Sequence, residues 1–208
     1  MVFRTLNAKR DFFRPKEDEE KILEHEIPYL SVIGSLLYLA QCTRPNISFA
    51  VNLLARYNNT PTPSTGMVLK TFFRYLKSTT DLGLFYTHKS LSVAAPNGPW
   101  IDSRFVGYAD AGYLSDPHRA RSQTCYVFTV GDTAISWRST KQTLVATSSN
   151  HAEILALHEA SRECFWLREV MEYIQITSGL TSVVNLPTTI FEDNATCIEQ
   201  LITSTSEH

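Results

Sequence analysis

The sequence lacks a C-x-x-C pair, although it contains four cysteines in 208 residues. Cys42, Cys125, Cys164 and Cys197 are widely spaced, which argues against a zinc site or a disulfide framework and is typical of a reducing compartment. No apolar run reaches the ~18 residues needed to span a membrane, and residues 1–7 lack the apolar core of a signal peptide. We therefore expect an intracellular protein, cytoplasmic or nuclear, without a transmembrane segment.

An excess of basic residues is also missing. The chain has 19 Lys and Arg against 21 Asp and Glu, for a net charge of −2. A free-standing nucleic-acid-binding protein is usually markedly basic, because phosphate contacts supply most of its affinity. A nucleic-acid role would therefore have to come from a local site or from neighbouring domains. Hydrophobic content of 43% is ordinary for a globular protein.

Two segments precede the part of the chain that could carry chemistry. Residues 1–27 are polar and charged, and we expect an extended lead-in whose charge run is most simply a solvated segment. In residues 28–79, apolar side chains recur with helical spacing between prolines, which predicts a small unit of three helices. Asn46 is the expected N-cap of the second helix.

From residue 80 to residue 208 the hydrophobic period drops to two and then returns to 3.6 in one long segment. We expect strands at 82–86 and 105–110, a hairpin at 125–130 and 133–137, a long helix at 150–174, a strand at 188–191 and a short final helix. This order predicts an α/β fold in which a mixed sheet packs against the long helix.

Three carboxylates stand where this order of elements can gather them. Asp110 and Asp193 each close a predicted strand at its carboxyl end, where open α/β sheets bind ligands. Glu153 lies in the first turn of the long helix. Converging carboxylates repel one another unless a divalent cation binds them, and Mg²⁺ prefers such hard oxygen ligands. Two such ions can clamp the attacking and leaving oxygens of a phosphodiester.

Each of these acids also has a purely structural interpretation. Glu153 follows Asn150 by three residues and could complete a capping box. Asp110 could be a turn residue before Gly112. Asp193, with its neighbour Asn194, could be the N-cap of the last helix.

The words around these acids carry a family resemblance that covers nearly the whole chain. In residues 13–77 they are FRPKEDEE (13–20), IPYLS (27–31), GSLLYLA (34–40), CTRP (42–45), NLLARY (52–57) and RYLK (74–77). In the second half they are YADA (108–111), SWRSTKQ (136–142), HAEI (151–154) and EDN (192–194). The first set resembles the end of the reverse transcriptase of copia-type (Ty1/copia) retrotransposon Pol polyproteins, and the second resembles their RNase H domain.

This resemblance implies a fold, a reaction and a cofactor. It implies an RNase H-like domain at 80–208, preceded by the helical tail of a reverse transcriptase at 28–79. Asp110, Glu153 and Asp193 would be three of the four catalytic, metal-binding acids, the cofactor Mg²⁺ or Mn²⁺, and the substrate an RNA–DNA hybrid whose RNA strand is cut.

The sequence also departs from the family pattern. Cys125 stands where copia sequences usually have Gly, and the helix at 64–77 lacks the aromatic residue often found near its start. The polymerase aspartates are absent, so the chain is not a polymerase. The family continues past the last helix to a fourth Asp, and this chain stops at His208. We therefore expect an RNase H-like domain truncated at its C-terminus and a nuclease that is impaired or inactive.

A second resemblance points to another class of protein. Residues 4–7 (Arg4, Thr5, Leu6 and Asn7) and the acidic run 17–20 (Glu17, Asp18, Glu19 and Glu20) are similar to the RxLR and dEER words of effectors that plant pathogens secrete into host cells. That reading implies a transposon-derived effector that acts on host proteins to suppress defence or cell death. A translated remnant without function is a third possibility.

Overall fold

The computed structural model describes residues 11, 13–14, 16–17, 19–20, 22–23, 28–86, 105–131, 133–179 and 187–205. Most of the predicted lead-in at 1–27 therefore lies outside the described residues. In chain order, the elements are α1 (Tyr29–Cys42), η1 (Pro45–Ile47), α2 (Ser48–Ala55), α3 (Pro63–Ser78), β1 (Val106–Asp116), η2 (Pro117–Arg119), β2 (Arg121–Val130), β3 (Thr133–Lys141), α4 (Ser149–Thr177), β4 (Thr189–Phe191) and α5 (Ala195–Thr205).

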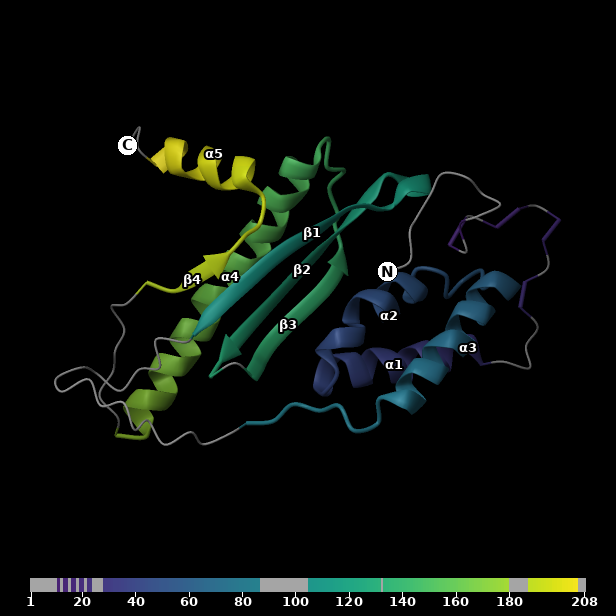
Figure 1. Cartoon of the computed structure of the whole chain (residues 1–208), viewed down its shortest axis with the longest axis horizontal. Helices are drawn as coiled ribbons and strands as arrows, with labels where there is room; N and C mark the ends of the chain where they lie inside the picture. Colours follow the sequence, from purple (N-terminus) through teal and green to yellow (C-terminus); the bar gives the residue numbers. More distant parts are fainter. Residues whose placement is uncertain are drawn as a thin grey trace.

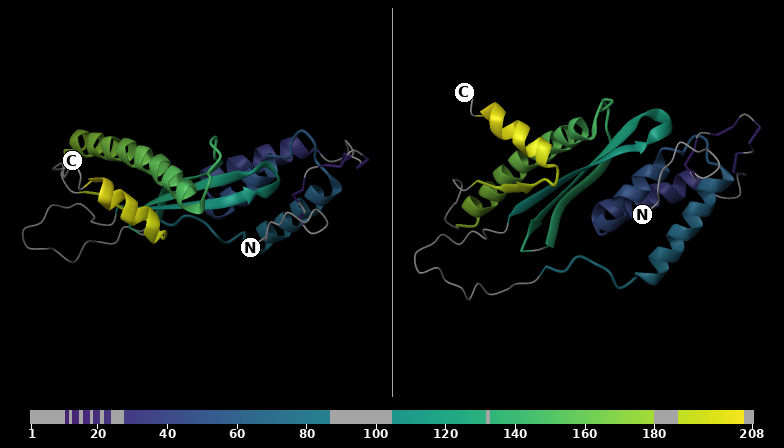
Figure 2. Two further views of the ribbon diagram at one scale, coloured as in Figure 1. Left: turned by 90° about the horizontal axis from the view of Figure 1, so that it is seen from above. Right: turned by 45° about the horizontal axis from the view of Figure 1, so that its top comes forward.

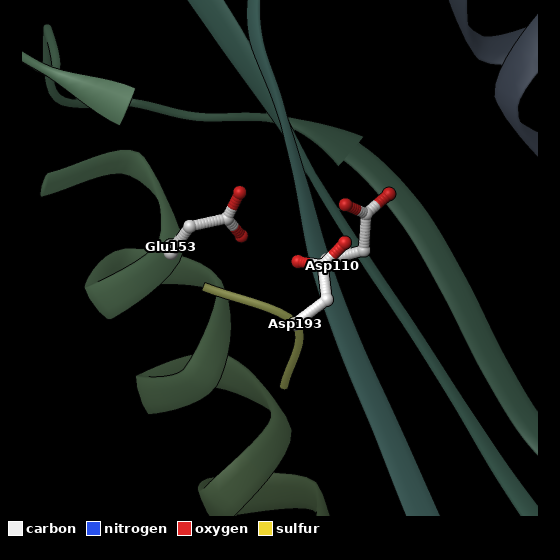
Figure 3. A group of neighbouring side chains, drawn as sticks. All are labelled: Asp110, Glu153 and Asp193. Atoms are coloured by element: carbon white, nitrogen blue, oxygen red, sulfur yellow. The ribbon is translucent and has the colours of Figure 1, made fainter. Parts of the chain in front are cut away.

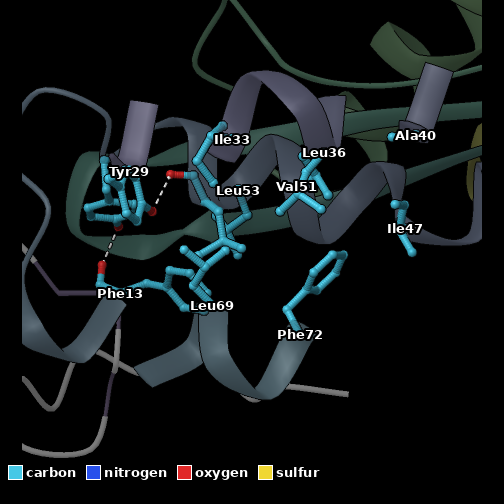
Figure 4. Close-up of a cluster of buried hydrophobic side chains, with 12 residues drawn as sticks. Phe13, Tyr29, Ile33, Leu36, Ala40, Ile47, Val51, Leu53, Leu69 and Phe72 are labelled. Atoms are coloured by element: carbon cyan, nitrogen blue, oxygen red, sulfur yellow. Dashed lines mark hydrogen bonds between the residues drawn. The ribbon is translucent and has the colours of Figure 1, made fainter. Parts of the chain in front are cut away.

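The first three helices form a unit with its own hydrophobic core (Figure 4). Ile33, Val51 and Leu54 are completely buried there, and each such side chain stabilises the unit by roughly 1.5–3 kcal/mol. Tyr29 donates a hydrogen bond from its hydroxyl to the carbonyl of Leu54 at 3.1 Å, which satisfies a polar group inside this core. The predicted helical unit is thus confirmed.

Asn46 is not the N-cap of the second helix, contrary to our expectation. It lies in η1, and Ile47 occupies the N-cap position of α2. The Asn46 side chain instead accepts a hydrogen bond from Arg44 Nε at 3.2 Å and donates one to the Tyr75 hydroxyl at 2.7 Å. The tight turn before α2 points this side chain toward α3, so it serves tertiary packing rather than capping.

The second half of the chain contains a four-stranded mixed sheet with the order β3-β2-β1-β4. The three long strands are antiparallel neighbours, whereas β4 pairs in parallel with β1 over three residues. Gly131, between β2 and β3, has a φ of 57°, a left-handed conformation that suits glycine. The mixed sheet predicted from the sequence is confirmed, with a longer first strand than expected.

The long helix α4 covers one face of this sheet (Figures 1 and 2). Ala152, Ala156 and Ala160 recur every four residues along one side of the helix and are completely buried. They belong to the clusters that contain Ala109 and Ala111 of β1. Such small side chains bring helix and sheet close together. The arrangement is compatible with an RNase H-like fold.

The helical unit contacts the opposite face of the sheet. Trp137 of β3 donates a hydrogen bond from its indole nitrogen to the carbonyl of Ala40, at the end of α1, at 2.7 Å. Arg56, which follows α2, donates to the side chain of Gln123 on β2. A Cβ atom on Gly112 of β1 would lie 3.3 Å from the ring of Phe49 in α2. This face is therefore covered by helices toward β3 and the tip of the β1–β2 hairpin.

Buried charges join the two units at that hairpin tip. Arg56 lies 3.6 Å from Asp116, the last residue of β1, and their side chains are only 6% and 1% exposed. His118 in η2 contacts Asp11 with 3.0 Å between Nε2 and Oδ2. The described part of the N-terminal segment is thus anchored against the sheet unit. We call these pairs the seam.

The expected strand at 82–86 is wrong, because these residues form no strand in the structure. Thr133 donates from its hydroxyl to the carbonyl of Phe85 at 2.7 Å, and Tyr86 donates from its hydroxyl to the carbonyl of Ala134 at 3.0 Å. Side chains rather than a backbone ladder hold this segment beside β3. The alternating apolar residues of this segment predict a strand, but its backbone does not pair with another strand.

None of the helices in the described ranges is both long and apolar enough to cross a membrane.

Candidate metal centre

Asp110 lies in β1, whereas Asp193 follows the neighbouring parallel strand β4, which ends at Phe191 and not, as expected, next to the acid. In the register of β1 and β4, Tyr108 is opposite Phe191, and each acid follows two residues later. Because side chains alternate between the faces of a sheet, Tyr108, Asp110 and Phe191 lie on the face away from α4. Asp110 lies inside β1, opposite Cys125 of β2, rather than at the strand's end as expected. A residue in the middle of a strand is no turn residue, which removes the structural alternative for Asp110.

Glu153 reaches the same place from the first turns of α4. The N-cap of this helix is Ser148, whose hydroxyl accepts the backbone N–H of His151 at 3.1 Å. The suggested capping box of Asn150 and Glu153 is therefore not formed. Neighbouring Ala152 packs with Ala111 of β1, which holds this end of the helix against the strand that carries Asp110.

The third structural alternative also fails, since Asn194 and not Asp193 caps the last helix. The side-chain oxygen of Asn194 accepts the backbone N–H of Cys197 at 3.0 Å. This hydrogen bond satisfies a free N–H in the first turn of α5. The carboxylate of Asp193 is left to face Asp110.

The three carboxylates converge on one spot (Figure 3). One oxygen atom of each of Asp110, Glu153 and Asp193 lies within 4.8 Å of the others. Asp110 and Asp193 are exposed, whereas Glu153 is only 7% exposed. The structure thus brings together all three acids selected from the sequence. Their roles as metal ligands and catalytic groups stay a prediction.

The electrostatics of this spot disfavour three free carboxylates. Burial, together with the charges of Glu192, Asp110 and Asp193, raises the pKa of Glu153 to about 7, although the backbone N–H of Ala111 opposes this shift. Burial and the charge of Asp193 likewise raise the pKa of Asp110. Among the described residues, no ion pair involves the three acids and no group donates a hydrogen bond to Glu153 Oε2, which is buried.

This donor set fits a hard divalent cation. The site offers only oxygen acceptors, one of them buried and unsatisfied, and no positive side chain of the described residues neutralises them. Mg²⁺ and Mn²⁺ prefer such ligands and bind through a few carboxylates while keeping several waters. The cation would replace the missing donors and lower the repulsion between the acids.

Sequence reasoning missed the residues that surround the acids. Tyr108 and Phe191 stack on each other beside the site, with ring centroids 5.2 Å apart, and are 47% and 51% exposed. Their period-two spacing from Asp110 and Asp193 could have revealed them. Glu192, the first residue of the EDN word, also belongs to these surroundings, because its charge acts on Glu153.

The words of the second resemblance are only partly visible. Residues 4–7 (Arg4, Thr5, Leu6 and Asn7) and Asp18 lie outside the described residues. Within the acidic run, Glu17 and Glu20 lie 3.3 Å and 3.0 Å from Arg14. Glu17 and Glu20 therefore form ion pairs within the N-terminal segment.

Comparisons with known proteins give two kinds of relative. Secreted RxLR effector protein 161 of Plasmopara viticola is 38% identical over 141 residues, which cover 68% of this chain and 92% of that protein. The retrovirus-related Pol polyproteins from transposon TNT 1-94 of Nicotiana tabacum and from transposon RE2 of Arabidopsis thaliana are 34% and 35% identical over 158 and 149 residues. These matches cover 76% and 71% of this chain.

The chain spans 11% and 9% of the length of those two polyproteins. No protein-family profile matches the chain. No solved structure matches it either.

Proposed function

Because the chain belongs to the family of copia-type retrotransposon Pol polyproteins, we propose that it carries an RNase H-like metal centre derived from a transposon. On this proposal, residues 28–79 correspond to the tail of a reverse transcriptase and residues 80–208 to an RNase H-like domain. The ancestral reaction is hydrolysis of the RNA strand of an RNA–DNA hybrid. The convergence of three carboxylate oxygens within 4.8 Å carries the proposal.

Asp110, Glu153 and Asp193 would hold the cation. When bound, Mg²⁺ or Mn²⁺ would activate a water molecule and stabilise the leaving oxygen of a phosphodiester. Asp110 and Asp193 are exposed, so a phosphate can approach them from solvent. Glu153 is buried behind them and would fix the cation from the helix side.

The exposed aromatic pair supports a nucleic-acid substrate. Tyr108 precedes Asp110 by two residues, Phe191 precedes Asp193 by two residues, and the two rings stack on each other. Bases and sugars stack on exposed aromatic rings without sequence preference. The pair would hold a strand beside the acids, which a net charge of −2 cannot do by general attraction.

The activity we propose is weak. An RNase H site has four acids by the resemblance above, and the group within mutual reach here has three. Fewer ligands should weaken the second cation and slow the step that needs both ions. Our expectation is that the purified chain cleaves an RNA–DNA hybrid far more slowly than an intact RNase H.

The test is cleavage of a labelled RNA–DNA hybrid in Mg²⁺ and in Mn²⁺, with Asp110→Asn as the control. Slow cleavage that Asp110→Asn abolishes supports the proposal. Rapid cleavage abolished by the same variant would contradict the impairment but not the reaction. Cleavage that survives in Asp110→Asn comes from a contaminant and removes the nuclease from this chain.

The effector relative favours a second candidate function. Secreted RxLR effector protein 161 matches over 92% of its length, so the two proteins share most of one fold. On this alternative, the transposon-derived fold acts on host proteins after secretion into a host cell, and the metal centre need not turn over substrate.

Expression of a tagged chain in plant cells would separate the candidates. Suppression of an induced cell-death response by both the native chain and Asp110→Asn supports an effector that does not use the site. Equal cell death with and without the chain would count against the effector reading.

A further inference from the structure

Three buried oxygen atoms near the start of α4 have no hydrogen-bond donor among the described residues. They are Asn150 Oδ1, Glu153 Oε2 and Glu192 Oε2. A buried acceptor without a donor typically costs about 1–3 kcal/mol. In this arrangement, and with both carboxylates ionised, all three atoms are acceptors, so none of them can donate to another. A cation is a ligand that satisfies several such oxygens at once.

Glu192 is held in this position by the turn before α5. Its Oε1 accepts the backbone N–H of Asn194 at 3.1 Å, while Asn194 caps α5 through Cys197. One oxygen of the carboxylate is therefore used by the turn. The other, Oε2, is buried and has no donor in the part of the chain that the structure describes.

The three oxygen atoms belong to neighbouring groups. Asn150 and Glu153 are three residues apart and share one side of α4. Asn150 is tied to α5, because its amide nitrogen donates to Gln200 Oε1 at 2.9 Å. Burial raises the pKa of the Cys197 thiol in α5, and the charges of Glu192 and Glu153 raise it further, so both carboxylates lie close to this buried cysteine.

Glu192 is not one of the three acids whose oxygens lie within 4.8 Å of one another. Glu192 precedes α5 by three residues, and its charge acts on Glu153 together with those of Asp110 and Asp193. Glu153 is therefore near both Glu192 and the other two acids. Its Oε2 is buried without a donor among the described residues and can bridge to a second ion.

We propose that Glu192 is a fourth acidic ligand of this centre and that it binds a second divalent cation together with Glu153 and the side-chain oxygen of Asn150. The inference rests on the proposed function, since Asp110, Glu153 and Asp193 must hold the first cation. Glu192 would then supply part of the charge that a three-acid site lacks.

The experiment is a titration of the full chain with MnCl₂ at pH 8, followed by calorimetry and by electron paramagnetic resonance of free Mn²⁺. We expect two ions per native chain and one in Glu192→Gln, with the weaker affinity reduced at least ~10-fold. Glu199→Gln, an exposed change on α5, the helix that follows Glu192, is the matched control and should keep two ions.

Melting temperatures without metal test whether Glu192 is merely structural. Replacing an uncompensated carboxylate by an amide should leave the metal-free melting temperature unchanged or raise it, while reducing the rise that Mn²⁺ causes. A lowered metal-free melting temperature with two ions still bound would overturn the proposal. Glu192→Asp, which keeps the charge, should bind the second ion with intermediate affinity.

The outcomes distinguish this inference from the proposed function. A native chain that binds no Mn²⁺ removes the whole centre. One ion in the native chain, lost in Asp110→Asn and unchanged in Glu192→Gln, overturns the role of Glu192 alone and leaves the three-acid site intact.

Discussion

Glu153 is only 7% exposed, and of the three acids it has the most strongly raised pKa. Its pKa rises from 4.5 to about 7, first because of burial and then because of neighbouring negative charges. Between those two pH values, the unfolded chain loses this proton and the folded chain keeps it. Stability from this group is thus complete below pH 4.5 and is lost as the pH rises through 7.

We therefore predict that the metal-free protein becomes less stable as the pH rises from 5 to 8, by on the order of 3 kcal/mol from Glu153. Mg²⁺ should reverse the fall at pH 8, because it binds the ionised form. Urea unfolding across this range, with and without Mg²⁺, measures the effect.

Glu153→Gln is the control for this pH dependence. It should flatten most of the fall and remove the response to Mg²⁺. A native chain whose unfolding free energy does not change over this range would show that Glu153 is ionised throughout.

The three acids could be predicted from the sequence because each stands in a distinctive word at the end or start of a periodic segment. The position of Glu153 behind Asp110 could not, because it depends on how closely α4 approaches β1. Glu192 was out of reach for a similar reason. Glu192 is next to Asp193 in the sequence, but only the fold shows that its carboxylate lies near Glu153.

At the scale of elements, the contact between α4 and β1 depends on very small residues. Gly107 of β1 is buried, and a Cβ atom there would lie 2.5 Å from the ring of Phe128, which is itself completely buried. That ring stacks with Phe105, with centroids 5.6 Å apart. Because the Phe128 ring is completely buried, it has no free space into which it could move.

We predict that Gly107→Ala destabilises the protein by about 1–3 kcal/mol through overpacking. Gly34→Ala is the matched control, since Gly34 lies in the middle of α1 with no atom within 4 Å of its added Cβ. That change should stabilise the helix by about 0.5–1 kcal/mol. Thermal melting of the two variants would contradict us if both shifted in the same direction.

Elements with a clear hydrophobic period were predictable, and those without one were not. The long helix was expected at 150–174 and found at Ser149–Thr177, because its buried alanines recur with helical spacing. β1 extends to Asp116, past the turn that Gly112 seemed to mark. Residues 82–86 alternate like a strand but have no backbone partner, and a single segment's periodicity cannot reveal a partner.

At the scale of the whole molecule, the seam joins the helical unit to the sheet unit. Arg56 and Asp116 are 60 positions apart in the chain, yet their nearly buried side chains lie 3.6 Å apart. No local pattern could predict such a pair, because neither residue has neighbours that mark it. The packing of the helical unit on the sheet is therefore a property that only the structure reveals.

We predict that Arg56→Leu destabilises the whole chain by about 3–5 kcal/mol, because it leaves the Asp116 carboxylate buried without this partner. Arg74→Leu, an exposed change on α3, should have little effect. Urea midpoints of both variants provide the measurement. Equal midpoints for the two would mean that water replaces the lost charge and that the seam is open.

Asp193, one of the three acids, lies two residues past β4, the shortest strand of the sheet. β4 pairs with β1 through three residues only, so it is among the elements that can detach most easily without unfolding the rest. Each detachment would move Asp193 away from Asp110, and the three acids would no longer be close enough to bind one cation. A cation that joins the two acids also fastens β4 and the helix after it. Ion capture and the local order of the last part of the chain are then one equilibrium, and the bound ion would slow amide hydrogen exchange there.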